Sequence, residues 1–299
     1  MTGDADRLPP RLWWVLGGLT LAWGFNWTAL KVALSEVPPW TFRSLCLGLG
    51  SAVLFAALRA GGQRLVLPRG QWGRLWLLAL LNITAWNMLI AFGVALIPSG
   101  RAAILAYTMP VWAVPLSIWL LGERITRSKL AGLTLGMCGL ALLLSESFVS
   151  LGSAPLGSLL ILGAALSWAF GAVLQKRFPV SLPAGLYTAW IMLLGGVPIF
   201  AGALLLEDPA ALRNVGLPAA LGTAYNVFIA FAFAHWAWIK IATSVPVSVF
   251  SISMLIIPVV GVLSGMLFLG ERPTWAEYAA LALVIASLLT VLRPRVARV

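Results

Sequence analysis

Charged side chains are scarce in this sequence, where they make up 10% of 299 residues; soluble domains carry about 25%. They are also clustered, so that long uncharged runs such as 75–100, 178–206 and 241–270 separate them. A helix crosses the hydrocarbon core of a bilayer with about 20 residues, which these runs provide. The composition therefore argues against a soluble domain and predicts an integral membrane protein.

Groups for catalysis or metal binding are equally few. The chain has one histidine and two cysteines, Cys46 and Cys138, which lie in different apolar runs and form no Cys-x-x-Cys pair. That pattern indicates neither a metal site nor a redox pair. No HExxH, GxSxG or Walker motif is present, and the nine acidic residues lie in tails, loops or the ends of apolar runs. We therefore expect no enzyme, no catalytic residue, no cofactor and no carboxylate proton relay within the membrane.

One stretch occurs twice, because residues 98–124 and 246–272 align without a gap. The copies share two prolines and their final turn: Pro98 with Pro246, Pro110 with Pro258, and Gly122-Glu123-Arg124 with Gly270-Glu271-Arg272. A second echo, at an offset of 145 residues, places Trp23 on Trp168 and Lys31 on Lys176. A duplicated unit predicts a duplicated architecture, here two halves at 1–150 and 151–299.

The apolar runs predict ten membrane spans, five in each half. These are 12–31, 39–58, 74–97, 99–121, 129–145, 156–175, 183–206, 217–239, 246–269 and 275–292. An open sheet would leave backbone groups unsatisfied in lipid, and runs that are continuous rather than alternating disfavour a β-barrel. The predicted fold class is an all-α integral membrane protein of ten transmembrane helices.

The net charge of +11 fits a membrane topology better than a nucleic-acid partner. With a cytoplasmic N-terminus, five of the 20 basic residues fall outside, namely Lys31, Arg43, Arg101, Arg213 and Arg272, and the others inside. The positive-inside rule then places both termini in the cytoplasm. Because each half has an odd number of spans, the second half is inverted relative to the first. Inverted repeats are typical of secondary transporters, whose substrate sites lie near the midplane.

Uncharged polar and aromatic groups lie deep within several spans. The predicted substrate-binding residues are Trp23, Asn26, Asn82, Trp86, Tyr107, Trp168, Tyr225 and Asn226. Each has an alternative interpretation, since aromatic side chains in membrane proteins commonly face lipid or pack against other helices, and amide side chains form hydrogen bonds between helices. As a group they predict a neutral, aromatic-walled cavity for an apolar or aromatic solute, which can also hold a cation by its ring faces.

Four further residues have two interpretations each. Pro110 and Pro258 favour kinks that could gate opposite mouths of one cavity, although prolines are also common in static membrane helices. His235 is the one side chain that titrates near neutral pH, so it is a candidate coupling residue or a histidine bonded to a neighbouring helix or interfacial water. Arg43 either snorkels to the headgroups or serves as a gate charge or carboxylate anchor.

Two GxxxG pairs, Gly132 with Gly136 and Gly261 with Gly265, permit close helix approach. That approach occurs either within the chain or in a dimer. We accordingly expect a monomer or a weak homodimer.

The paired Pro-x11-Gly-Glu-Arg stretches, the Trp-Gly-Phe-Asn run at 23–26 and the ten predicted spans resemble the drug/metabolite transporter superfamily. Within it the chain is most similar to the EamA-type members, in particular to bacterial aromatic amino acid exporters of the inner membrane. The resemblance implies that spans 1, 3, 4, 6, 8 and 9 surround a central cavity, with spans 5 and 10 at the periphery. It also implies broad specificity that includes flat organic cations.

The expected function is therefore that of a secondary transporter, which exports aromatic and other neutral amino acids and related amphipathic metabolites by alternating access. Three rivals stay open. A multidrug or organic-cation exporter would be favoured by a carboxylate deep in the cavity, and none is visible. A lipid or nucleotide-sugar carrier would be favoured by a basic cavity, but the basic groups are peripheral. A membrane enzyme or structural subunit is disfavoured by the missing catalytic set and by the duplication.

Overall fold

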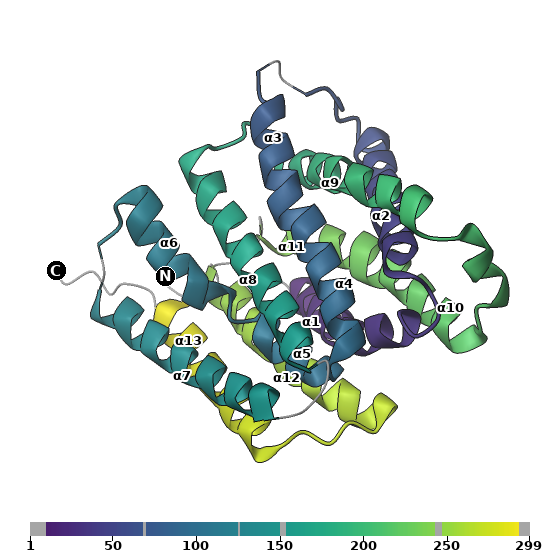
Figure 1. The fold of residues 1–299 in the computed structure, drawn as a ribbon. Helices are drawn as coiled ribbons and strands as arrows, with labels where there is room; N and C mark the ends of the chain where they lie inside the picture. The colour runs from purple at the N-terminus through teal and green to yellow at the C-terminus, as the bar shows by residue number, and fades with distance from the viewer. Residues whose placement is uncertain (1–9, 68–69, 125, 150–153, 243–246, 293–299) are drawn as a thin grey trace.

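The computed structural model describes residues 10–67, 70–124, 126–149, 154–242 and 247–292, and in those ranges the chain is helical without strands (Figure 1). The helical elements are α1 (Pro10–Ala33), α2 (Pro39–Ala60), α3 (Trp72–Ala79), η1 (Leu80–Ala85), α4 (Trp86–Leu96), α5 (Ser99–Ala106), α6 (Met109–Leu121), α7 (Arg127–Val149), α8 (Ala154–Arg177), α9 (Ala184–Leu206), η2 (Pro209–Asn214), α10 (Leu217–Ala224), η3 (Tyr225–Phe233), α11 (Ala234–Ala242), α12 (Val247–Leu269) and α13 (Trp275–Leu292).

Helix lies over every range that the apolar runs predict, and the bounds differ by four residues at most, at the end of α7. By length and composition, seven of the described helices are long and apolar enough to cross a membrane. Ile256–Leu269 and Trp275–Thr290 are shorter apolar helices. The structure thus agrees with an all-helical membrane protein, and the count of ten spans stays a prediction.

The third and eighth predicted spans are each interrupted by a π-helix. The element η1 separates α3 from α4, and η3 separates α10 from α11. The offset of 145 residues that relates Trp23 to Trp168 also relates the first residue of η1, Leu80, to the first residue of η3, Tyr225. π-Helical segments inside α-helices are rare and are frequent at functional sites. Sequence periodicity gave no sign of either one.

The two copies of the repeated stretch differ in backbone conformation. The first breaks at Tyr107 and Thr108, and α6 begins directly afterwards with Pro110 in its first turn, where the missing N–H has no helical partner to lose. The second copy remains one continuous helix, α12, through Pro258. The chain is therefore interrupted just before Pro110 and is helical through Pro258, and the gating role of the two prolines stays a prediction.

The turns that end the two copies have the same conformation. Gly122 and Gly270 both adopt a left-handed backbone with φ of 65°, which glycine tolerates at a helix C-terminus without steric penalty. In each copy a threonine, Thr126 or Thr274, then accepts a 3.2 Å hydrogen bond from the backbone N–H three residues later. Each repeated turn thus ends one helix and caps the next in the same way.

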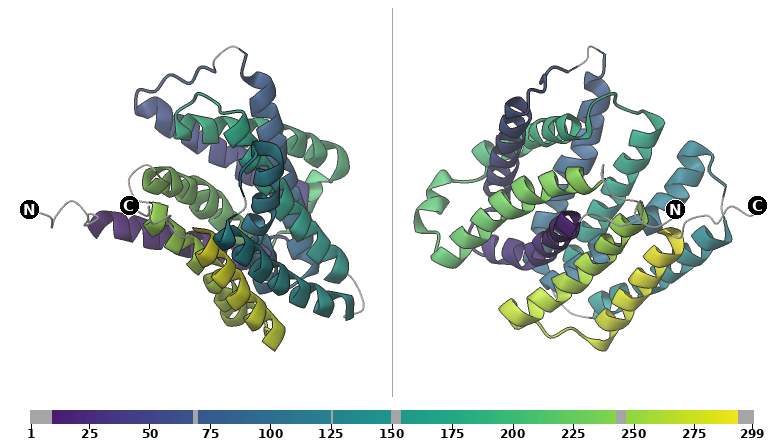
Figure 2. Two further views of the ribbon diagram at one scale, coloured as in Figure 1. Left: turned by 90° about the vertical axis from the view of Figure 1, so that its left-hand side faces the viewer. Right: turned by 180° about the vertical axis from the view of Figure 1, so that it is seen from behind.

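The principal helix pairs join the first half of the chain to the second. Helix α7 lies along α13, α2 along α9, α1 along α12, and α8 along α4 and α6; α7 and α13 form one edge of the molecule (Figures 1 and 2). The largest buried apolar cluster includes residues of both halves, for example Phe42 and Leu105 with Ile161 and Met192. The halves therefore interleave around a shared core.

The predicted GxxxG pairs are used within the chain. A Cβ at Gly136 would lie 2.1 Å from Cγ2 of Val111 in α6, and Ser287 of α13 donates a 2.6 Å hydrogen bond to the carbonyl of Gly132. In α12, a Cβ at Gly261 would lie 2.9 Å from the Cβ of Ala103. These glycines let α7 and α12 approach their neighbours closely.

We expect Gly136→Ala to lower the stability of the folded protein by about 1–3 kcal/mol, because the added methyl overpacks the contact with Val111. Gly48→Ala is the matched control, since a Cβ there meets nothing within 4 Å and alanine favours a helix interior by about 1 kcal/mol over glycine. Thermal unfolding in detergent measures both variants. Equal midpoints for the two would contradict the contact.

Candidate functional site

Three predicted site residues meet where α8 crosses η1 and α4. The rings of Trp86 and Trp168 have centroids 5.0 Å apart, and both residues are half-buried. The Asn82 side chain donates a 3.0 Å hydrogen bond to the Trp168 carbonyl. It fits there because Gly171 has no side chain: a Cβ at Gly171 would lie 2.1 Å from Asn82 Oδ1. The structure thus joins residues 86 apart in sequence.

The π-helix η1 supplies part of this contact. Ser167 of α8 donates a 2.8 Å hydrogen bond to the carbonyl of Leu81, and Thr84 donates a 2.7 Å hydrogen bond to the carbonyl of Gly195 in α9. A π-helical stretch shifts the backbone hydrogen-bond pattern away from i to i+4. Side chains of α8 and of η1 itself thus anchor the irregular segment on two neighbouring helices.

Trp23 lies in a second aromatic group, beside η3. Its indole donates a 3.2 Å hydrogen bond to the carbonyl of Ala230, and its ring lies 5.8 Å from His235, edge-on, and 5.2 Å from Trp238. The His235 ring also stacks on Phe231 at 5.3 Å. Trp23 and Trp168, related by the sequence repeat, therefore each contact a π-helical span of the other half.

His235, at the start of α11, bonds to the preceding π-helix η3 in this structure. Its Nδ1 lies 3.1 Å from the carbonyl of Ala230, and the two ring contacts above cover it. Within the described ranges no salt bridge involves His235. A coupling role for this histidine stays a proposal.

Three further residues that the sequence predicts for the site, Tyr107, Tyr225 and Asn226, make no ring contact with either tryptophan group among the described residues. Tyr225 donates a 2.9 Å hydrogen bond to the carbonyl of Ala22. Asn226 is fully buried and donates a 3.0 Å hydrogen bond to Gly222, one turn back. Tyr107 lies half-buried at the break between α5 and α6. Within the described residues no ring contact joins Trp23 to the Trp86–Trp168 pair, so one common cavity stays a prediction.

Three predicted asparagines share one unexpected property. The Oδ1 atoms of Asn26, Asn82 and Asn226 are buried and have no hydrogen-bond partner within the described part of the chain. A buried acceptor without a donor costs about 1–3 kcal/mol, and such groups call for an explanation. The Asn82 oxygen lies at the close contact with Gly171 of α8, so protein encloses it in this structure.

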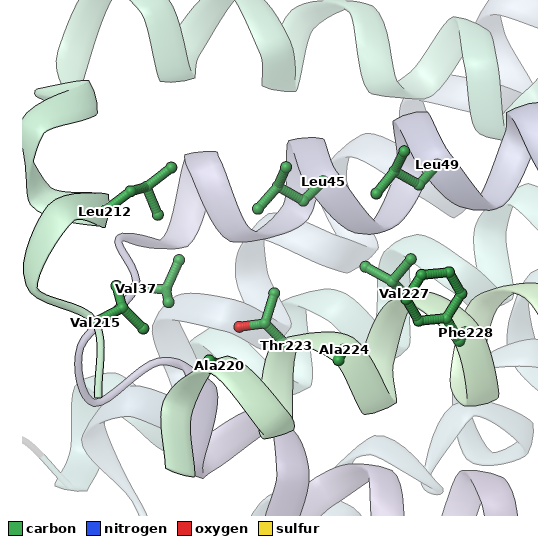
Figure 3. Close-up of a pocket in the computed structure, with 10 residues that line it drawn as sticks. All are labelled: Val37, Leu45, Leu49, Leu212, Val215, Ala220, Thr223, Ala224, Val227 and Phe228. Atoms are coloured by element: carbon green, nitrogen blue, oxygen red, sulfur yellow. The ribbon is translucent and has the colours of Figure 1, made fainter. Parts of the chain in front are cut away.

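A lateral groove of about 290 Å³ lies between α2 and the α10–η3 segment (Figure 3). It extends from Val37 and Leu212 to Leu49 and Phe228, and Thr223 is the one polar residue among those that line it. None of the predicted site residues lines this groove. Its apolar wall offers no group to orient a polar solute, so we do not assign the site to it.

Among the described residues, three glutamates cap the N-termini of helices far from them in sequence, at one end of the molecule. Glu207 accepts hydrogen bonds from the backbone N–H groups of Trp40 and Thr41 in α2, at 3.0 and 2.7 Å. Glu36 accepts from Gly216, directly before α10. A carboxylate at a helix N-terminus satisfies free N–H groups and complements the helix dipole. We call this the clamped end; it comprises the turns at 34–38, 97–98, 207–216 and 270–274.

The third glutamate, Glu271 of the repeated turn, belongs to a latch around the turn at 97–98. It accepts hydrogen bonds from the N–H groups of Ser99 and Gly100 at the start of α5, at 2.6 and 3.0 Å. Lys31 donates to the carbonyls of Val94, Ala95 and Ile97 at the end of α4, at 2.6, 3.1 and 2.9 Å. We call Lys31 and Glu271 the latch, because they hold both sides of that turn.

The repeat counterparts of the latch, Lys176 and Glu123, lie at the other end of α8. This helix begins beside the clamped end, where a Cβ at Gly157 would lie 2.6 Å from Ile97, and it ends at Arg177, which donates to the carbonyl of Leu120 at 2.7 Å. There Glu123 accepts from Lys129 and lies 3.7 Å from the Lys176 nitrogen. The hydrogen bond from Lys129 lowers the pKa of Glu123. Lys176 and Glu123 thus contact charged side chains, whereas Lys31 and Glu271 bind backbone groups.

Sequence reasoning missed the caps, the latch and the free asparagine oxygens. In the repeated sequence Lys31 aligns with Lys176 and Glu123 aligns with Glu271, and this alignment was the one sequence signal for the latch. Their partners are backbone groups of distant helix ends, which no sequence pattern marks.

Comparison with known proteins gives a family match in each half. The family described as the EamA-like transporter family matches residues 12–145 and 155–293. Among curated proteins, the chain is 27% identical to a probable amino-acid metabolite efflux pump of Escherichia coli strain K12, over 90% of this chain and 91% of that protein. It is 27% identical to the uncharacterized transporter YoaV of Bacillus subtilis, over 86% and 88%.

A further relative is the uncharacterized inner membrane transporter YedA of Escherichia coli, 26% identical over 94% of this chain and 90% of that protein. A solved crystal structure matches with a TM-score of 0.66 and 22% identity, and covers 95% of this chain and 96% of that chain. At that identity the match establishes a shared fold.

Proposed function

We propose an export function for this chain, which belongs to the EamA-like transporter family. The substrates are amino acids, aromatic and other neutral ones first, and related small amphipathic metabolites, which leave the cytoplasm across the bacterial inner membrane. The relatives named as an amino-acid metabolite efflux pump and as an inner membrane transporter support this assignment. The observation that carries it is the half-buried Trp86–Trp168 pair, whose ring faces would pack on an aromatic or apolar solute.

The two halves would be inverted repeats, with both termini in the cytoplasm. Three observations support this proposal. The family matches twice along the chain. The π-helices and Gly-Glu-Arg turns recur at related positions. The two turns lie near opposite ends of α8, whose 24 residues span roughly 36 Å at 1.5 Å per residue.

Alternating access would follow from exchanging the latch between the two ends. In this structure Lys31 and Glu271 hold the α4–α5 turn, while Lys176 and Glu123 approach each other. In the opposite state Glu123 would cap the start of α12, and Glu271 would release α5. Pro110 and Pro258 would gate the two mouths. In this structure the helix that carries Pro110 is separated from α5, whereas the helix that carries Pro258 is continuous, so the two copies would exchange these conformations between the two states. With cytoplasmic termini, the clamped end would face outward.

An exporter of flat organic cations is the second candidate. The Trp86–Trp168 pair favours it, because indole faces bind cations. A flat organic cation has no carboxylate, so this second function would need no protein group that binds one.

Transport by the purified protein in liposomes tests the assignment. We expect counterflow of labelled phenylalanine and tryptophan that empty liposomes lack, whether or not a pH gradient is present, because no acidic residue lies within a predicted span away from its ends. Counterflow should also persist in His235→Asn. Counterflow of a flat quaternary cation without any of amino acids would contradict the proposal and establish the rival.

A further inference from the structure

Arg43 lies on the second turn of α2 and is buried within the protein. Its residue surface is 2% exposed, and its Nε atom is buried without a hydrogen-bond partner. The guanidinium carbon lies 5.2 Å from the ring centre of Phe42 and 5.8 Å from that of Phe231 in η3. A snorkelling arginine would extend its head to the membrane surface, so the snorkelling interpretation of Arg43 is wrong for this structure.

Among the residues that the structure describes, no carboxylate forms a salt bridge with Arg43. The salt bridges among the described residues involve other partners, and Glu207 at the start of the same helix already accepts from Trp40 and Thr41. Arginine stays protonated in proteins, and a buried charge without a partner is strongly unfavourable. The two phenylalanine rings compensate only part of that cost. A bound anion would supply the partner that the guanidinium lacks among these residues.

The Phe231 ring connects Arg43 to the candidate site. It stacks on His235, whose ring in turn lies edge-on to Trp23. A row of aromatic rings thus runs from the buried guanidinium to one of the predicted substrate-binding tryptophans. An amphipathic solute lying along this row would place a negative group at Arg43 and an apolar group against the rings.

We propose that Arg43 binds the carboxylate of the transported amino acid, an inference that rests on the proposed export function. The guanidinium fork matches a carboxylate in a bidentate geometry, which gives direction as well as attraction. This assignment favours substrates that carry a carboxylate over the flat organic cations of the rival function.

Binding by the purified full-length protein tests the proposal, with quenching of tryptophan fluorescence as the readout. Wild type should bind phenylalanine roughly tenfold to a hundredfold more tightly than phenylalaninamide, which lacks the carboxylate. Arg43→Gln should bind both as weakly as wild type binds the amide. Arg43→Lys keeps the charge but loses the fork, so it should fall between the two. Arg213→Gln, which removes an exposed charge, is the matched control and should bind as wild type does.

Thermal unfolding separates binding from a structural role. Arg43→Gln removes an unpaired buried charge, so its midpoint in the absence of ligand should equal or exceed that of wild type. A lower midpoint together with an equal loss for both ligands would make Arg43 a packing residue and overturn the proposal. Unchanged phenylalanine binding in Arg43→Gln would overturn it as well.

A further experiment distinguishes failure of the proposed export function from failure of the Arg43 site. If wild type binds neither phenylalanine nor tryptophan, benzoate and indole-3-acetate serve as probes of the anion site alone. Stabilisation by these carboxylates that Arg43→Gln abolishes would retain the Arg43 site and reject amino acids as substrates. No such stabilisation would reject the Arg43 site.

Discussion

Glu271→Gln should reduce transport by roughly a hundredfold while the protein remains folded, because the latch then loses the charge that binds the start of α5. Glu271 accepts two backbone hydrogen bonds there, and hydrogen bonds to a charged group contribute about 1.5–3 kcal/mol each. A loss of about 3 kcal/mol from one of two states changes their ratio by more than a hundredfold, since 1.4 kcal/mol is about tenfold. The state that is closed at the clamped end would become a minor one.

Cysteine labelling measures that shift directly. Val262 of α12 is 3% exposed and its Cα lies 3.2 Å from the Cβ position of Gly100, so α5 and α12 must separate before a reagent reaches it. In a chain without Cys46 and Cys138, Val262→Cys should react slowly, and Glu271→Gln should accelerate the reaction. Glu123→Gln is the matched control at the repeat counterpart: it should slow transport without accelerating labelling. Equal labelling rates in all three would exclude the latch.

Trp168→Ala should weaken substrate binding by roughly tenfold or more, and Trp86→Ala should do the same. A ring that stacks on a solute contributes on the order of 1 kcal/mol beyond burial, and each 1.4 kcal/mol is about tenfold in affinity. Removal of either ring also deprives the other of its neighbour at 5.0 Å. The Asn82 contact survives in Trp168→Ala, because it is made to the backbone carbonyl. The expected loss is therefore one of binding and not of fold.

Uptake assays on correctly inserted protein decide this prediction. Trp119 provides the control, since it is 75% exposed in α6 and its replacement by alanine should leave the affinity for phenylalanine unchanged. Phenylalanine in place of Trp168 keeps a ring and should recover part of the affinity. Wild-type transport by both Trp86→Ala and Trp168→Ala would show that these rings serve helix packing, and the site would then lie elsewhere.

The sequence by itself determined which segments are helical and where they turn. Lipid excludes unsatisfied backbone, so uncharged runs of about 20 residues have no other stable form than helix. The predicted bounds 99–121 coincide with the outer bounds of α5 and α6. The repeated Gly122 and Gly270 turns were readable because only glycine adopts their left-handed backbone at low cost. Composition and the duplicated stretch were also sufficient to indicate a membrane transporter.

Only the tertiary structure decided how polar groups are used. The partners of Glu271, Lys31 and Asn82 are backbone atoms of helices far away in sequence, and a backbone atom leaves no residue-type signal. The identical placement of Pro110 and Pro258 in the repeat did not predict that one copy breaks and the other continues, because packing against different neighbours selects between two conformations of similar sequences. Arg43 became informative for the same reason: its residue type allows either a snorkelling head or a buried one, and the helices around it determine which occurs.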